Sequence, residues 1–129
     1  SKFTFPNSRS DVILKIGEEK LHVSKELLAV HSSFFETLFY GNFAEKGKEE
    51  VVIKDVSCKE FVDVLNVIYC HTNGITDFTV ANILKLADRF QMERLLNLSE
   101  KHLIQSTRFD EMKKLQFADQ YRLASLKVF

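Results

Sequence analysis

Residues 11–43 constrain the fold more than any other part of the chain, because their hydrophobic pattern changes from strand-like to helix-like. Two short apolar runs, at 12–16 and 21–23, flank a Gly-Glu pair at 17–18, and this arrangement predicts a β-hairpin. Ser24 follows directly and is a suitable N-cap, so the strong helix formers after it predict a short helix. A hairpin joined to a helix within so short a stretch indicates a compact folding unit.

A second helix is predicted immediately after the first. Ser33 and Glu36 form an S-x-x-E capping box, in which the two side chains satisfy backbone N–H groups at the helix start. Helical spacing continues to about Tyr40, where Gly41-Asn42 is a typical stop. One face of this helix is expected to carry Phe35, Leu38 and Phe39.

The rest of the chain predicts one more strand and several helices. Residues 51–53 form a short apolar run, which we expect to add to the hairpin because so short a strand is unstable alone. A second capping box, Ser57 with Glu60, opens a helix over 58–70. Further helices are predicted at 80–90, 92–105 and 110–121, with a helical remnant at 123–129. The apolar face of 58–70 consists of Phe61, Val64, Leu65, Ile68 and Tyr69.

Strands early in the chain and helices later indicate an α+β fold, with a small three-stranded sheet covered by a helical bundle. A length of 129 residues favours one domain. The hydrophobic share of 45% includes twelve Phe, and each fully buried Phe contributes about 1.5–3 kcal/mol to a core. The sequence ends on an apolar residue within a helical pattern, which indicates a fragment of a longer protein.

Charge and composition exclude several kinds of partner. Eighteen basic and eighteen acidic residues cancel, and no basic run of the kind that binds DNA or RNA occurs. The apolar runs are too short to cross a bilayer and no signal-peptide pattern begins the sequence, so no membrane association is expected. Two cysteines without a paired spacing predict reduced thiols. We therefore expect an intracellular protein of the cytoplasm, the nucleus or both.

Histidine and cysteine give no catalytic or metal-binding pattern. The four histidines share no ligand spacing, and the adjacent Cys70-His71 would point about 100° apart on a helix. A Cys–His nucleophilic pair would lack an oxyanion partner or a nucleophile elbow. No glycine-rich phosphate-binding motif is found. We expect no enzyme activity, no cofactor, no metal and no small-molecule substrate.

The spacing D-V-x-L, followed by x-L-H-V-x-K-x-L-L-A-x-x-S-x-x-F, resembles the opening of a BTB/POZ domain. The resemblance covers residues 11–106, preceded by an extended lead-in at 1–10. Residues 107–129 resemble the start of the helical extension that follows cullin-binding BTB domains. The segments LLAVHSSFFETLF and LKLADRFQM are similar to BTB proteins that carry a MATH domain. The apolar face expected for the extension is Phe117, Ala118, Tyr121 and Leu126.

The same resemblance implies a cullin-binding site. In cullin-binding BTB adaptors, a φ-x-E motif lies in the loop after the second helix, and its apolar residue packs on the cullin. Phe43 and Glu45 fall on that motif, and Phe39 lies on the helix just before it. Tyr69 occupies the I-Y position, where the family also contacts cullin. The usual Thr-Gly-like continuation after Tyr69 is replaced here by C-H-T-N-G, so Tyr69 is a weaker candidate than Phe43 and Glu45, and its alternative is a core role.

Asp11 and Lys25 are the second candidate site. A carboxylate at the start of an apolar strand is costly to bury unpaired. In similar BTB domains, the matching acidic and basic residues form a charged pocket near the dimer interface. The alternative is that the two residues cap a helix or form a plain surface pair.

Two functions follow from the resemblance. The first is a substrate adaptor that docks on cullin-3 in a ubiquitin ligase and also forms a homodimer, which could be weak. The alternative is a homodimerising scaffold or transcription-regulator BTB domain that recruits co-repressors. Such domains commonly carry an exchanged N-terminal helix, and the lead-in SKFTFPNSRS is too short and polar to be one. A potassium-channel tetramerisation domain shares the broad fold but fits the D-V-x-L pattern less well.

Overall fold

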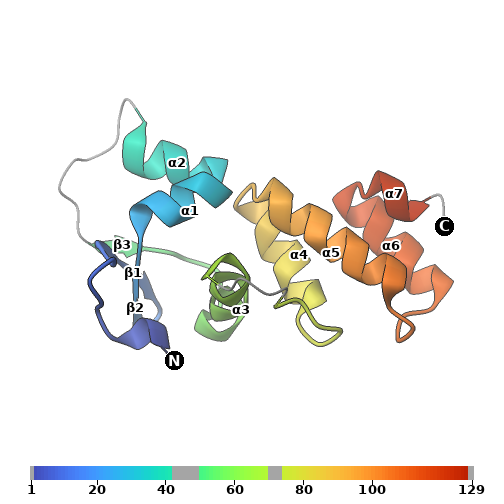
Figure 1. The fold of residues 1–129 in the computed structure, drawn as a ribbon, viewed down its shortest axis with the longest axis horizontal. Coiled ribbons are helices and arrows are strands. Elements are labelled where there is room, and N and C mark those ends of the chain that lie inside the picture. Colours follow the sequence, from blue (N-terminus) through green and yellow to red (C-terminus); the bar gives the residue numbers. More distant parts are fainter. Residues whose placement is uncertain (1, 42–49, 70–73, 128–129) are drawn as a thin grey trace. The chain divides into compact units, whose positions relative to one another are not determined.

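A computed structural model describes residues 2–41, 50–69 and 74–127 of the chain (Figure 1). In these ranges the chain forms three strands, seven α-helices and a short 3-10 helix, η1 (Lys2–Thr4). The mixture of a small sheet with many helices is the expected α+β class. The chain divides into two compact units, Ser1–Val62 and Asp63–Phe129.

The first unit contains a three-stranded sheet in which β1 (Val12–Ile16) lies between β2 (Glu19–Val23) and β3 (Glu50–Val52). β1 and β2 are antiparallel, and Gly17 (φ +60°) is the first central residue of the two-residue turn between them. Glycine adopts positive φ without strain, and at this position it fits a type II′ hairpin turn. The predicted hairpin is therefore confirmed.

The third strand adds to the hairpin as predicted, although its bounds differ. β3 runs parallel to β1 and pairs Val51 with Leu14. It begins and ends one residue before the predicted 51–53. Ile53 lies beyond the strand, yet its backbone N–H still donates to the carbonyl oxygen of Lys15 at 2.9 Å, and its side chain is buried. Apolar character therefore located this strand but could not fix its ends.

One face of the hairpin forms the core of the first unit. Alternate side chains of β1 and β2 are almost fully buried, whereas Ile13, Lys15 and His22 on the other face stay partly exposed. This alternation is the period-two pattern of a half-buried sheet. The buried side chains are those of Val12, Leu14, Ile16, Leu21 and Val23.

Two short helices, α1 (Lys25–His31) and α2 (Ser33–Tyr40), follow β2 and pack against each other (Figure 1). Ser24 caps α1 as predicted, because its hydroxyl oxygen accepts a hydrogen bond from the backbone N–H of Leu27 at 3.2 Å.

The cap of α2 corrects the predicted capping box by one residue. Ser32, not Ser33, accepts the capping hydrogen bond, from the backbone N–H of Phe35 at 3.1 Å. Ser32 is almost fully buried, whereas Ser33 is exposed as the first residue of the helix. With Ser32 as the cap, the side chain of Phe35 is completely buried. The burial of that large ring decides between two adjacent serines that are equally suitable as caps.

Gly41 ends α2, as predicted, while Asn42 lies outside the described residues. The Gly41 backbone N–H donates to the carbonyl oxygen of Thr37 at 2.9 Å. A Cβ atom on Gly41 would collide with that same oxygen. The tight closure of the helix therefore requires glycine through close approach, since its φ of −70° is open to any residue.

α3 (Cys58–Tyr69) begins with the predicted capping box. The hydroxyl of Ser57 accepts from the backbone N–H of Glu60 at 3.1 Å and donates to the Glu60 carboxylate at 3.2 Å. The boundary between the two units falls within this helix, after Val62. In the first unit, the ring of Phe61 meets that of Phe35 edge to face, with centroids 6.2 Å apart.

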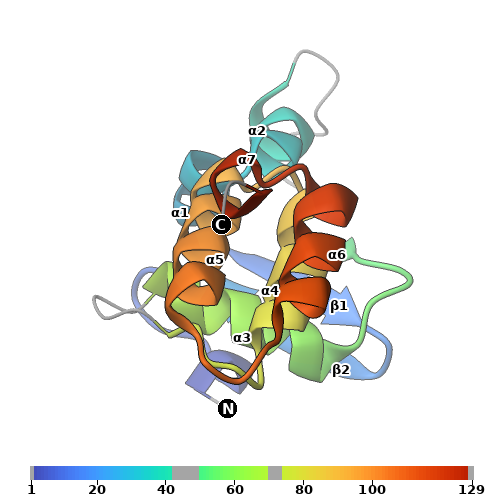
Figure 2. The ribbon, with the colours of Figure 1, turned by 90° about the vertical axis from the view of Figure 1, so that its right-hand side faces the viewer.

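The second unit is helical after α3. It comprises α4 (Val80–Arg89), α5 (Glu93–Gln105), α6 (Glu111–Tyr121) and α7 (Ala124–Lys127). α5 contacts each of the other three, and Figure 2 shows α4 and α5 side by side. These helices agree with the predicted ones to within two residues at each end. Their buried side chains include Ile83, Leu86, Ala87, Leu95, Leu103, Phe117, Ala118 and Leu126.

Candidate protein-interaction surface

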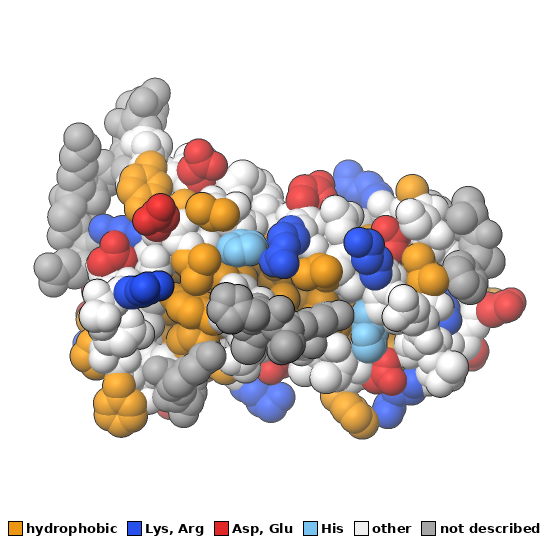
Figure 3. Space-filling model, viewed as in Figure 1, with side chains coloured by type: hydrophobic (Ala, Val, Ile, Leu, Met, Phe, Trp, Pro, Cys, Tyr) orange, Lys and Arg blue, Asp and Glu red, His pale blue; other side chains and the backbone are white. Residues whose placement is uncertain are grey.

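α2 exposes several apolar side chains around its buried ring, Phe35. Phe34, Leu38 and Tyr40 are 37%, 38% and 59% exposed, and we call these three residues the α2 surface. Figure 3 shows hydrophobic side chains at the surface in the region of α2, at the upper left. Of the three residues predicted to share one face of this helix, Phe35 is buried, Phe39 is half-buried and Leu38 is exposed. Exposed apolar side chains on a helix are suited to contact with a protein partner.

Phe39 links the α2 surface to α1. Its ring stacks on the buried ring of Phe35, with centroids 5.7 Å apart, and is itself half-buried. The ammonium of Lys25 lies 5.9 Å from the centroid of the Phe39 ring. A cation–π contact of this kind contributes about 0.5–1 kcal/mol at an exposed site. The Phe39 ring therefore contacts both Phe35 and Lys25, which restricts its orientation next to the α2 surface.

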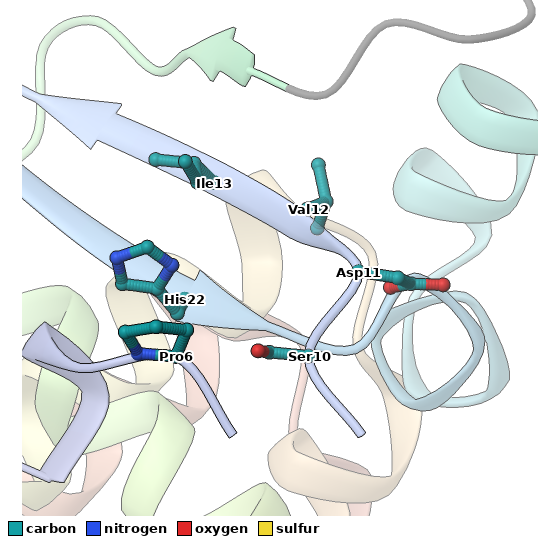
Figure 4. Close-up of a pocket in the computed structure, with 6 residues that line it drawn as sticks. All are labelled: Pro6, Ser10, Asp11, Val12, Ile13 and His22. Carbon is teal, nitrogen blue, oxygen red and sulfur yellow. The ribbon is translucent and has the colours of Figure 1, made fainter. Parts of the chain in front are cut away.

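Asp11 caps α1 from a distant part of the chain. Its carboxylate oxygen Oδ1 accepts a hydrogen bond from the backbone N–H of Lys25 at 2.8 Å, and Figure 4 shows the carboxylate turned toward α1. The Asp11 backbone N–H donates to the carbonyl oxygen of Val23 at 3.0 Å, which places the carboxylate at the helix start. A negative charge there satisfies a free N–H group and complements the helix dipole.

The contact between Asp11 and Lys25 therefore has the geometry of the capping alternative. It joins the Asp11 carboxylate to the backbone N–H of Lys25, while the Lys25 ammonium lies over the Phe39 ring. Asp11 is exposed. The charged pocket at a dimer interface stays a prediction.

A shallow pocket lies beside Asp11. Its volume is about 250 Å³, below the roughly 300–1,000 Å³ that is typical of small-molecule sites. Figure 4 shows Pro6 next to the His22 ring, on the outer face of the hairpin where His22 pairs with Ile13. This pocket is a weaker candidate than the α2 surface. Its lining residues are Pro6, Ser10, Asp11, Val12, Ile13 and His22.

Two of the four predicted cullin-binding residues can be placed in the structure, Phe39 in α2 and Tyr69 in α3. Phe43 and Glu45, like Cys70 and His71, lie outside the described residues. Tyr69 is the last residue of α3 and is half-buried. Of the predicted site residues, Asp11, Lys25 and Phe39 form a connected group in the first unit through the two contacts described above.

The second unit contains a polar cluster that sequence reasoning missed. Oδ1 of Asp77 accepts hydrogen bonds from the Ser106 hydroxyl and from Nε2 of His102, both at 2.7 Å. These bonds, that from Ser106 first, lower the pKa of Asp77 below its ordinary value. The serine donates to the aspartate and not to the histidine, so the group lacks the nucleophile–base pair of a catalytic triad. The cluster instead fastens the loop before α4 to the end of α5.

The described part of the chain shows no further chemistry of this kind. Its His, Cys, Asp and Glu side chains include no group of three or more placed to hold a metal ion. No helix among the described residues has the length and hydrophobicity that crossing a bilayer requires.

A small sheet, short capped helices and an exposed apolar helix face define an α+β protein-interaction domain. More specifically, the chain belongs to the BTB/POZ domain family, since the model of that family matches residues 3–107. BTB and MATH domain-containing protein 36 of Caenorhabditis elegans is 43% identical over 118 residues, which cover 92% of this chain and 37% of the relative. Human Kelch-like protein 28 is 31% identical over 67% of this chain and 15% of its own length.

Solved structures agree with the assignment. The BTB domain of zebrafish PATZ1 has a TM-score of 0.61 and 26% identity, over 75% of this chain and 77% of that one. The BTB domain of human gigaxonin shares the fold, with a TM-score of 0.59 and 20% identity over 70% of this chain and 75% of that one. The chain spans less than half the length of the BTB and MATH domain-containing relatives it matches, 30–43% for three of them.

Proposed function

We propose that this domain belongs to a substrate adaptor, which docks on cullin-3 in a ubiquitin ligase and also self-associates. The α2 surface is the observation that carries the proposal. Two of its members, Leu38 and Tyr40, occupy the last turn of α2, and the φ-x-E motif of Phe43 and Glu45 follows within a few residues. Exposed apolar side chains on α2, followed in the sequence by an aromatic residue and a nearby charge, have the composition of a small interface hot spot.

Similarity to BTB and MATH domain-containing proteins supports the adaptor class over a scaffold that recruits co-repressors. In this function the domain performs no chemistry itself, because the ligase supplies the ubiquitin-transfer machinery. Its role is to hold a substrate-binding partner domain against the cullin. Self-association would place two substrate-binding domains in one complex and raise the effective concentration of a bound substrate.

Titration calorimetry against the N-terminal region of cullin-3 tests the docking. We expect the domain to bind with a Kd of about 1 μM or below. The Phe43→Ala/Glu45→Ala variant should bind at least about tenfold more weakly, as is usual when an aromatic hot spot is removed. Phe5→Ala is the matched control, because Phe5 is 73% exposed on the N-terminal segment and should leave the affinity unchanged.

The remaining outcomes discriminate between functions. If the double variant binds as tightly as the parent, the cullin surface lies elsewhere, and Tyr69→Ala then tests the I-Y position. If the folded parent domain does not bind cullin-3, the adaptor function is wrong, and the scaffold that recruits co-repressors becomes the working hypothesis. Sedimentation of the parent domain over a range of concentrations reports self-association independently of either result.

A further inference from the structure

The turn between α6 and α7 contains an arginine, and a serine follows it closely in the sequence. Arg122 precedes Ser125 by three residues, and no other arginine in the sequence has serine or threonine at that spacing. Both residues are exposed. Arg122 ends α6 in the left-handed conformation (φ +58°), and after the buried Leu123 the residues Ala124 and Ser125 are exposed.

α7 is a short helix that packs against α5 and α6. A helix of four residues, Ala124–Lys127, is far too short to be stable alone. Two side chains, those of Leu123 and Leu126, are buried and anchor it. The residue before the helix, Leu123, has no side-chain acceptor for a cap. Glu100 of α5 takes that role, since its Oε2 accepts from the backbone N–H of Leu126 at 3.0 Å.

The surroundings of Ser125 are acidic. Ser125 lines a cavity of about 500 Å³ within the second unit. Asp88, Glu93 and Glu100 line the same cavity, with Arg122 as the cation among them. Three carboxylates against one guanidinium give this cavity a net negative charge, and a further anion placed there would be repelled.

We propose that Ser125 is a phosphorylation site for a serine kinase that selects arginine three residues before its target, and that the phosphate releases α7 from α5. In the transfer, the Ser125 Oγ attacks the γ-phosphorus of ATP and the bond to the ADP oxygen breaks. The hydroxyl proton passes to the catalytic base of the kinase. A kinase cleft with paired carboxylates recognises the Arg122 guanidinium through bidentate hydrogen bonds.

The fold supports both halves of this proposal. A kinase binds its target segment in an extended form, and α7 can unfold locally because it is a single turn whose anchors among the described residues include Leu123, Leu126 and the hydrogen bond to Glu100. A phosphoserine carries a charge of about −1.5 to −2 at neutral pH. Ser125 and Glu100 line the same cavity, so the phosphate repels the carboxylate that caps α7. Because α7 is a single turn, we expect this repulsion to exceed the attraction of the phosphate to the helix start and to detach the helix.

The first test measures phosphate transfer to the whole domain by an arginine-directed serine kinase with Mg-ATP, with the site located by peptide mass spectrometry. We expect one phosphate on Ser125 and none there in Ser125→Ala. Arg122→Asn should be phosphorylated roughly tenfold more slowly, since asparagine tolerates the left-handed turn but lacks the guanidinium. Ser57, three residues after Lys54, is an internal control, because its hydroxyl is engaged in the α3 cap.

The second test measures the release of α7. Phosphorylation should lower the melting temperature and increase hydrogen exchange at the backbone amide of Leu126. In Glu100→Gln the amide oxygen can still accept from Leu126 while the repelled charge is gone, so the phosphate should lower the melting temperature less. Ser125→Ala treated with kinase and Mg-ATP is the control for any effect of the treatment itself.

Several results would overturn the proposal. If the kinase modifies a peptide of residues 118–127 but not Ser125 in the folded domain, the fold hides the site and the proposal is wrong. If the kinase modifies neither the peptide nor the folded domain, the segment is not a substrate and the proposal is also wrong. If Ser125 is phosphorylated with unchanged melting and unchanged exchange at Leu126, the release of α7 is refuted.

Discussion

Single carboxylates in this domain fasten segments that are far apart in sequence. Asp11 reaches an N–H group 14 residues away, and Asp77 receives donors from residues 25 and 29 positions further on. Neither pairing leaves a periodic signal in the sequence, because hydrogen bonds of this kind depend on how elements pack. Sequence reasoning singled out Asp11 through its place at the start of an apolar strand and in a family pattern, and it passed over Asp77 entirely.

The two hydrogen bonds to Asp77 predict a pH dependence of stability. They lower the pKa of the folded carboxyl below the ordinary value of about 3.9. The folded state therefore binds its proton later than the unfolded state as the pH falls. The stabilisation is fully present above the ordinary pKa and is lost as the pH falls through the lower folded value.

Asp77→Asn should accordingly melt below the parent domain at pH 7, and this difference should shrink once the pH falls below about 4. Thermal melts followed by circular dichroism from pH 7 to acid give the measurement. Glu18→Gln, at an exposed hairpin-turn residue, is the control for removing one carboxylate. A difference that stays constant over the whole pH range would show that the charge on Asp77 is not what stabilises the cluster.

At the scale of elements, periodic hydrophobicity was enough to predict the hairpin, α3 and the helices of the second unit. It failed at helix ends where two residues compete. Ser32 and Ser33 are chemically equal as caps, and the choice depends on the burial of Phe35, which is a tertiary effect. Spacing placed Phe35 and Leu38 on one face of α2, but it could not reveal how much of that face the neighbouring elements cover, since Phe35 is buried and Leu38 is exposed.

The Asp11 cap of α1 predicts a measurable cost on its removal. Asp11→Ala should lower the free energy of unfolding by about 1 kcal/mol, the usual cost of losing a cap. Asp11→Asn should lose less, because its side-chain oxygen can still accept from the Lys25 N–H. Urea unfolding followed by circular dichroism measures both.

Sedimentation of the same variants separates the cap from the charged pocket. A cap acts through stability, so Asp11→Asn should keep the self-association of the parent. If Asp11→Asn unfolds like the parent but no longer self-associates, the charge acts at an interface and the charged-pocket interpretation is correct.

On the scale of the whole molecule, the sequence led to the family and the fold class, which the family match and solved structures confirm. The division of the chain into two units was not foreseen, since the hydrophobic pattern runs through α3 without interruption. The boundary after Val62 means that Phe61 and Val64, both fully buried, lie in the same helix but belong to different units.

A shared helix predicts that the two units unfold together. Separating them would cut α3 in its middle, break backbone hydrogen bonds there and leave two halves too short to persist. Leu103→Ala in α5 removes a fully buried side chain of the second unit and should cost about 2–5 kcal/mol. In this variant, NMR amide signals from β1 and from α5 should disappear at the same, lowered urea concentration.

Leu115→Ala is the matched control for this experiment, because Leu115 in α6 is 46% exposed and its truncation should change stability by no more than about 0.5 kcal/mol. One result would contradict the prediction that the two units unfold together. If Leu103→Ala causes the α5 signals to vanish while those of β1 persist to the urea concentration of the parent domain, α3 does not couple the units. The first unit would then be stable without the second, and its cullin-binding candidates could be studied on residues 1–69 alone.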